Sequence, residues 1–135
     1  MRVFSIRLGL LALVLLASPP AEAAWDPEAY RDVSTLEFLT VAPEEGEHWS
    51  PVWLVVLDGQ VYIRLGSRAA ERMQKNTKAP YVKLRIGGEE FERVRAEPAP
   101  DMVERVGQAM GEKYTSDFLV RYFNHPLTMR LTPEP

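Results

Sequence analysis

Apolar and polar residues alternate along much of the chain, and this pattern predicts six β-strands. Val61, Ile63 and Leu65 alternate with polar neighbours in residues 60–65, and residues 81–86 alternate in the same way. Residues 49–57 are almost continuously apolar, so both faces of this strand are expected to be buried, at the centre of the sheet. The remaining strands are expected at residues 34–41, 89–97 and 127–131.

Two dipeptides are typical of tight hairpin turns. Asp58-Gly59 separates the second and third predicted strands, and Gly87-Gly88 separates the fourth and fifth. Both can adopt the left-handed backbone conformations that a two-residue turn requires. The sequence therefore predicts two antiparallel hairpins.

Helical segments interrupt and follow the strands. Residues 67–76 are expected to form a short helix whose first amides are capped by Ser67, and apolar residues fall at helical spacing over 102–114. A further short helix is expected over 117–123, capped by Ser116. The fold class predicted is mainly β with short helices (α+β), a small antiparallel barrel of about six strands over residues 34–135, preceded by a polar lead at 24–33.

The first 23 residues have the parts of a Sec-type signal peptide. Arg2 and Arg7 give the n-region its positive charge, and residues 8–17 form the apolar core. Ala21-Glu22-Ala23 predicts cleavage after Ala23. An uncleaved anchor is the alternative, but about ten apolar residues are half of what a membrane-spanning helix needs. We therefore expect a periplasmic or secreted protein with no membrane attachment after cleavage.

Composition narrows the function classes. Loss of Arg2, Arg7 and Glu22 with the signal takes the net charge from −3 to −4, which does not favour nucleic acid as a partner. The chain has no cysteine, which excludes disulfides, thiolate metal sites and a cysteine nucleophile. His48 and His125 lack the acidic spacing of a metal site, so no metal is expected.

Basic residues lie on the polar sides of three predicted strands. They are Arg64, Lys83, Arg85, Arg93 and Arg95. Either they line a groove for an anionic ligand, or they form a solvated face balanced by nearby glutamates, which is the commoner arrangement. The aromatic residues Trp49, Trp53 and Tyr62 are expected in the barrel core rather than on a stacking platform.

Gly66-Ser67-Arg68 stands where a helix is expected to begin. Free backbone amides, a hydroxyl and a guanidinium at such a place can hold a phosphate. A plain helix cap needs only Ser67. Both interpretations stay open at this point.

Residues 48–86 resemble the pyridoxamine 5'-phosphate oxidase-like FMN-binding split-barrel family. The resemblance rests on the order of its motifs: Ser-Pro-Val-Trp at residues 50–53, the Asp-Gly hairpin, the Gly-Ser-Arg helix start, then Lys-Asn before a strand that begins at Pro80. It extends over the predicted sheet and implies a split β-barrel.

The resemblance also implies a cofactor site. Matched residue by residue, Ser50, Val52 and Trp53 would lie beside the ring of a flavin, either FMN or a deazaflavin. Ser67 and Arg68 would bind the cofactor phosphate, with Lys75 as a second phosphate ligand. The family usually builds this site between two subunits, so a homodimer is expected.

Two functions follow from these observations. The first is a flavin-dependent oxidoreductase of unknown substrate, in which the cofactor supplies the hydride chemistry and no catalytic dyad is needed. The second is a cofactor-free small-ligand binding or interaction module on the same barrel. A chain exported unfolded would acquire any cofactor after export.

Overall fold

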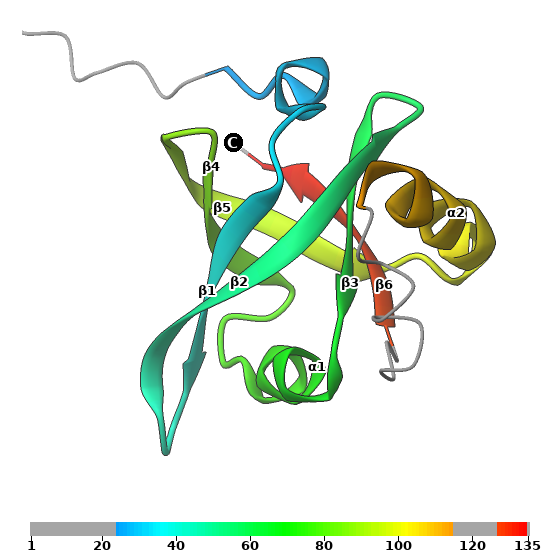
Figure 1. Cartoon of the computed structure of the whole chain (residues 1–135). Coiled ribbons are helices and arrows are strands. Elements are labelled where there is room, and N and C mark those ends of the chain that lie inside the picture. The colour runs from blue at the N-terminus through cyan, green and yellow to red at the C-terminus, as the bar shows by residue number, and fades with distance from the viewer. Residues whose placement is uncertain (1–23, 115–126, 135) are drawn as a thin grey trace, which may run out of the picture.

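The protein is a closed six-stranded antiparallel barrel with two short helices on its outside (Figure 1). The computed structural model describes residues 24–114 and 127–134. Around the barrel the strands follow the order β1-β2-β3-β6-β5-β4. The predicted fold class, a small split β-barrel of mainly β structure, is confirmed.

The strands and helices lie close to their predicted positions. The strands are β1 (Thr35–Ala42), β2 (Gly46–Leu57), β3 (Gln60–Leu65), β4 (Tyr81–Ile86), β5 (Glu89–Pro98) and β6 (Leu127–Pro133). The helices are α1 (Ser67–Lys75) and α2 (Val103–Lys113), and two short 3-10 helices are η1 (Pro27–Tyr30) and η2 (Pro100–Met102).

Both predicted hairpin turns are present. Asp58 and Gly59 have φ angles of 52° and 70°, and Gly87 and Gly88 have φ angles of 58° and 78°. These left-handed conformations match the right-handed twist of the strands that they join. The turns therefore set the registers of β2 with β3 and of β4 with β5.

The barrel interior holds one apolar cluster, to which every strand contributes. Its fully buried members include Phe38, Leu54, Ile63, Leu84, Val94 and Leu131. Each such side chain contributes about 1.5–3 kcal/mol relative to an exposed one. Because the side chains of a strand alternate, the polar residues of the same strands face outward.

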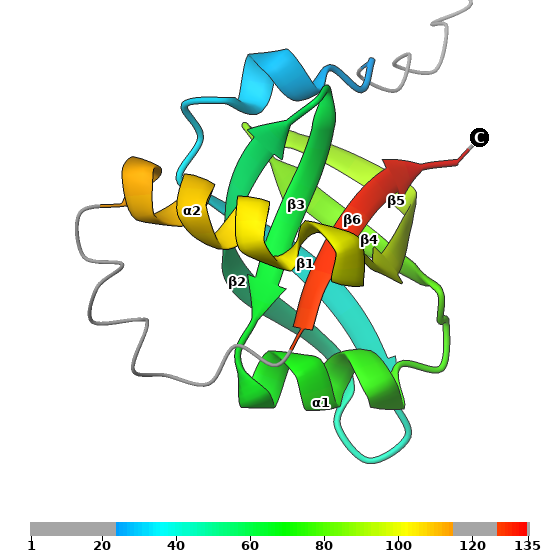
Figure 2. The same ribbon diagram turned by 90° about the vertical axis from the view of Figure 1, so that its right-hand side faces the viewer.

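A second apolar cluster lies outside the barrel, where α2 packs on β2 and β3 (Figure 2). It joins Val55 and Tyr62 to Val106 and Met110. The prediction that Tyr62 belongs to the barrel core is wrong: the residue is 2% exposed, but it lies outside the barrel, beneath α2. The alternation of apolar and polar residues along a strand cannot show that a helix later in the chain covers the outer face of the barrel.

Within this closed ring of strands, the hydrogen-bond ladder is split along the first half of β2. The ladder between β2 and β3 covers only Leu54–Leu57, so within the described part of the chain the segment from Gly46 to Trp53 pairs with β1 alone. Pro51, which has no amide to donate, lies in this segment. The prediction that β2 is a central strand is therefore wrong for its first half, and α1 lies across this end of the barrel (Figures 1 and 2).

The opposite end carries the residues predicted as a polar lead. Tyr30 of η1 is 3% exposed, and its hydroxyl donates to Glu89 Oε2 at 2.9 Å. Trp25 packs on Tyr30 and Phe91, with ring centroids 5.4 and 5.1 Å apart. This segment is thus part of the packed domain.

Some predictions fall outside the described residues. They are the signal peptide at 1–23, the short helix at 117–123 with Ser116, and His125. Within the described part of the chain, no helix is long and apolar enough to cross a membrane.

Candidate functional site

A pocket of about 480 Å³ lies where the split edge of β2 meets the start of α1. From β2 come His48, Ser50 and Pro51, and the helix start contributes Gly66, Ser67, Arg68, Ala69 and Arg72. The fold thus brings together three of the predicted site residues, Ser50, Ser67 and Arg68.

The start of α1 offers uncapped amides to this pocket. Gly66 is the N-cap, with φ −69° and ψ 174°, and no side chain of residues 24–114 and 127–134 caps the helix. The first intrahelical bond runs from the Ala70 amide to the Gly66 carbonyl at 2.9 Å. The amides before Ala70 have no acceptor within the helix, and the helix dipole makes them favourable to an anion.

The prediction that Ser67 caps this helix is wrong. Ser67 is the first helical residue, one position beyond the cap. Its hydroxyl makes no capping bond with the first-turn amides. A plain cap therefore does not account for this serine.

Ser50 carries a buried polar atom without a partner. The residue is 3% exposed, and its Oγ has no hydrogen-bond partner among the described residues. Leaving a buried hydroxyl unpaired costs about 1–3 kcal/mol. Ser50 lines the same pocket as the helix start, so a ligand there would satisfy it once the buried Oγ rotated toward the pocket.

The two arginines of the pocket differ in their bonding. Arg72 donates to both carboxylate oxygens of Glu45, at 2.9 and 3.4 Å, and this bonding lowers the pKa of Glu45. His48 Nδ1 lies 3.8 Å from the same carboxylate. Arg68 makes no hydrogen bond or ion pair with any described residue, so its guanidinium is available to an anion.

His48 and Arg72 were not predicted as site residues. Arg72 follows Arg68 by four positions, which places both on one face of a helix, and this spacing is a signal that the sequence contains. His48 lies two residues before Ser50, on the same side of the strand. Either spacing could have added the residue to the predicted set.

The structure does not bring the other predicted site residues into this pocket. Val52 is 8% exposed and belongs to the interior cluster. Trp53 stacks on Tyr114, with centroids 4.4 Å apart and planes 6° apart. Lys75 pairs with Glu71 at 2.9 Å and lines a neighbouring hollow of about 190 Å³, which shares Arg68 and Arg72 with the pocket.

The predicted aromatic core residues also need correction. Trp49 and Trp53 are half-buried and do not belong to the interior cluster. Trp49 lies under the Arg85 guanidinium, 3.8 Å from its ring centroid. Because both residues have the outward parity of β2, the barrel interior is closed to them.

Most of the basic residues on the strands have acidic neighbours. Lys83 lies 3.2 Å from both Glu90 and Glu92, and Arg95 lies 2.6 Å from Glu134. The balanced-face interpretation thus accounts for these two residues. No group of three acidic or histidine side chains could hold a metal ion within residues 24–114 and 127–134.

Comparison with known proteins identifies the fold of the chain. No protein-family profile matches the chain, and no curated protein sequence matches it. A solved structure of a heme storage protein from Vibrio cholerae superposes with a TM-score of 0.60 at 17% identity, over 80% of this chain and 87% of the other.

Two further solved structures are similar. An F420-H2-dependent reductase has a TM-score of 0.53 at 13% identity, over 74% of this chain and 94% of its own. A FAD-binding protein from Mesorhizobium loti has a TM-score of 0.51 at 14% identity, over 80% and 85%. The chain therefore has the split-barrel fold. It is the fold that the resemblance to the pyridoxamine 5'-phosphate oxidase-like proteins implies.

Proposed function

We propose that the protein is an exported split-barrel protein that binds a flavin-type cofactor, FMN or a deazaflavin, through the pocket at the start of α1. The observation that carries the proposal is the meeting of three unsatisfied groups in one pocket. They are the uncapped first-turn amides of α1, the uncommitted Arg68 guanidinium and the unpaired Ser50 hydroxyl. An anion, such as a cofactor phosphate, would satisfy all three.

These residues fit the phosphate end of such a cofactor. Ser67 and Arg68 would hold the phosphate together with the amides, and Ser50 would donate its hydroxyl proton. The unpaired edge of β2, from Gly46 to Trp53, offers backbone groups to the remainder of the molecule. When bound, a flavin supplies the hydride chemistry, and the protein supplies binding and orientation.

Two neighbours in fold support this choice of ligand. One is a reductase that depends on F420-H2, and the other is a FAD-binding protein. A homodimer is part of the proposal, because no phenylalanine, tyrosine or tryptophan side chain lines the pocket among the described residues of one copy. A second copy would supply the surface against the ring.

The alternative is a cofactor-free module that binds a small phosphate or another anion in the same pocket. The position of Trp53 favours it, because this residue stacks on Tyr114 and does not line the pocket. Such a module would bind inorganic phosphate about as well as FMN. A flavoprotein would bind FMN far more tightly.

Absorbance between 350 and 500 nm, before and after adding FMN or a deazaflavin, tests the proposal. We expect a bound cofactor and a raised melting temperature. Arg68→Ala should weaken binding about 10- to 100-fold, because it removes a charge-assisted contact. Arg31→Ala is the matched control, since Arg31 is exposed, lies outside the pocket and, among the described residues, pairs with Glu28.

A colourless protein whose melting temperature ignores both cofactors would exclude the flavin function. If inorganic phosphate then raised the melting temperature and Arg68→Ala abolished that rise, the cofactor-free alternative would hold. Equal effects of Arg68→Ala and Arg31→Ala would place the anion elsewhere.

Export is tested separately, by the mass of the product. The full chain expressed in a Gram-negative host should yield a periplasmic protein that begins at Ala24. A product that retains residues 1–23 and stays with the membrane fraction would favour the uncleaved anchor.

A further inference from the structure

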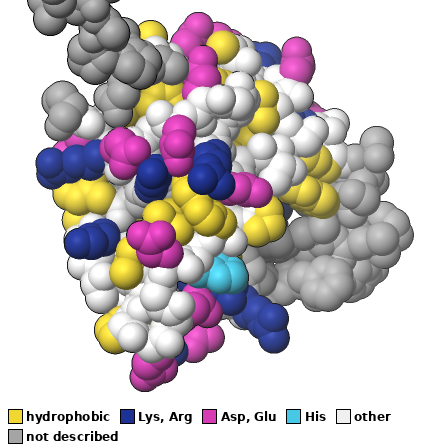
Figure 3. Space-filling view, turned by 90° about the vertical axis from the view of Figure 1, so that its left-hand side faces the viewer, with side chains coloured by type: hydrophobic (Ala, Val, Ile, Leu, Met, Phe, Trp, Pro, Cys, Tyr) yellow, Lys and Arg dark blue, Asp and Glu magenta, His cyan; other side chains and the backbone are white. Residues whose placement is uncertain are grey.

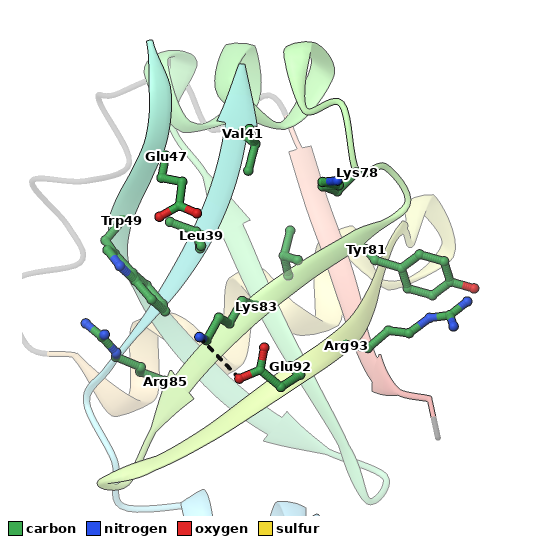
Figure 4. Close-up of a pocket in the computed structure, with 11 residues that line it drawn as sticks. Leu39, Val41, Glu47, Trp49, Lys78, Tyr81, Lys83, Arg85, Glu92 and Arg93 are labelled. Carbon is green, nitrogen blue, oxygen red and sulfur yellow. Dashed lines mark ion pairs between the residues drawn. The ribbon is translucent and has the colours of Figure 1, made fainter. Parts of the chain in front are cut away.

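A second groove, of about 500 Å³, lies on the outer face of the barrel across β1, β2, β4 and β5 (Figure 4). It opens where β1 and β4 diverge, because their ladder covers only Glu37–Leu39 against Lys83–Arg85. The loop after α1 bridges the gap, as the Thr77 amide donates to the Val41 carbonyl at 2.8 Å. The fold thus holds the groove open.

The floor of this groove is apolar. Leu39, Val41 and Val82 line it, and Figure 3 shows hydrophobic side chains on this face with lysine, arginine and glutamate side chains around them. A small inorganic ion would gain nothing from such a floor. A ligand with an apolar body would gain about 25 cal/mol for each Å² of apolar surface removed from water.

Two guanidinium groups are stacked on aromatic rings of the groove. Arg85 lies 3.8 Å from the ring centroid of Trp49, and Arg93 lies 4.0 Å from that of Tyr81. Stacking fixes the plane of a guanidinium and leaves its N–H edges for an acceptor. Their ion pairs are long: Arg93 is 3.9 Å from Glu134, and Arg85 is 3.4 Å from Glu90 and 3.9 Å from Glu37.

The charges that line the groove favour an anion. Lys78, Lys83, Arg85 and Arg93 line it together with Glu47 and Glu92, and Glu92 is already paired with Lys83 at 3.2 Å. Lys78 makes no ion pair with any residue in the described ranges. Among the lining carboxylates a cationic ligand would therefore find only Glu47 without an ion pair to a described residue, whereas an anion would find Lys78 and the two arginines, whose ion pairs are long.

We propose that this groove binds a small organic anion with an apolar body, such as an aromatic carboxylate. The apolar part packs on Leu39 and Val41, and the carboxylate accepts hydrogen bonds from the stacked guanidinium of Arg93 or Arg85. The site shares no lining residue with the pocket at the start of α1. It stands independently of the flavin proposal.

A matched pair of probes tests the proposal on the mature chain. Titration calorimetry should show 2-naphthoate binding at least about fivefold more tightly than uncharged 2-naphthol, because only the carboxylate engages the arginines. The indole N–H signal of Trp49, assigned with Trp49→Phe, should shift on binding. Equal affinities of the two probes, or no binding, would overturn the proposal.

Charge-matched variants locate the anion. Arg93→Gln and Arg85→Gln together should remove the preference for naphthoate, whereas Arg31→Gln and Arg105→Gln together, which lose the same two charges outside the groove, should keep it. The binding of FMN should be unchanged in the variant that lacks Arg85 and Arg93. A failure of the groove proposal can therefore be told apart from a failure of the proposed flavin function. If naphthoate does not bind and the same variant dissociates a dimer in sedimentation, a second copy covers the groove and the proposal is wrong.

Discussion

At the residue scale, the sequence predicts a residue of the candidate pocket only where few structural roles would explain that residue type at that position. Ser67 and Arg68 after a glycine at a helix start pointed to an anion, and Ser50 entered through the family resemblance. The structure adds that Ser50 Oγ is buried and unpaired, which no spacing along a strand can show. Lys75 stays a predicted phosphate ligand, although its i,i+4 partner Glu71 pairs with it and it does not line the pocket.

Ser50→Ala should stabilise the ligand-free protein by about 1 kcal/mol, because it removes a buried hydroxyl that has no partner. Urea unfolding followed by fluorescence measures this change. Ser67→Ala is the control, since Ser67 is exposed, and its effect should stay within about 0.5 kcal/mol. A destabilised Ser50→Ala protein would mean that the hydroxyl has a partner in solution, and the argument for a ligand there would weaken.

At the element scale, the hairpins and strand positions were predictable because their signals are local in sequence. Each hairpin has a turn dipeptide and alternating residues in the strands beside it. Asp58-Gly59 and Gly87-Gly88 fix the turns, and alternation then assigns the inward residues. What local signals do not show is the position of α2 over Val55 and Tyr62. That contact joins residues about 50 apart in sequence, and only the closed fold brings them together.

Met110→Ala on α2 should lower the free energy of unfolding by about 2–4 kcal/mol, because Met110 is 1% exposed in the cluster between α2 and the barrel. Val103→Ala on the same helix is the matched control, since Val103 is 50% exposed, and it should cost less than about 0.5 kcal/mol. Chemical denaturation measures both. Similar costs for the two variants would show that α2 is not packed on the barrel in solution.

At the scale of the whole molecule, the two ends of the barrel have different roles. The split end, beside α1, carries the unpaired edge of β2 and the candidate pocket. The other end is closed by residues 25–30, which begin at the second residue of the predicted mature chain. The sequence predicts only a polar lead for this segment, because its two aromatic residues lie among charged residues and show no periodicity.

The Tyr30 hydroxyl makes this closure sensitive to alkaline pH. Burial, with the hydrogen bond to Glu89 next, raises the pKa of Tyr30 to about 12. Between pH 10 and 12 the unfolded phenol ionises while the folded one stays protonated, so the contribution is complete below pH 10 and is lost as pH rises to 12. Stability should therefore fall by about 2–3 kcal/mol over this range through Tyr30 alone.

Tyr30→Phe isolates this contribution, because it keeps the ring that packs on Trp25 and removes the ionisable group. Near neutral pH the variant should be less stable than the natural chain by about 1 kcal/mol, the worth of one hydrogen bond. As pH rises from 10 to 12 the natural chain should lose this advantage and become the less stable of the two. Urea unfolding at half-unit pH steps measures the crossing. Parallel stability curves for the two proteins would show that residues 25–30 leave the barrel before Tyr30 titrates.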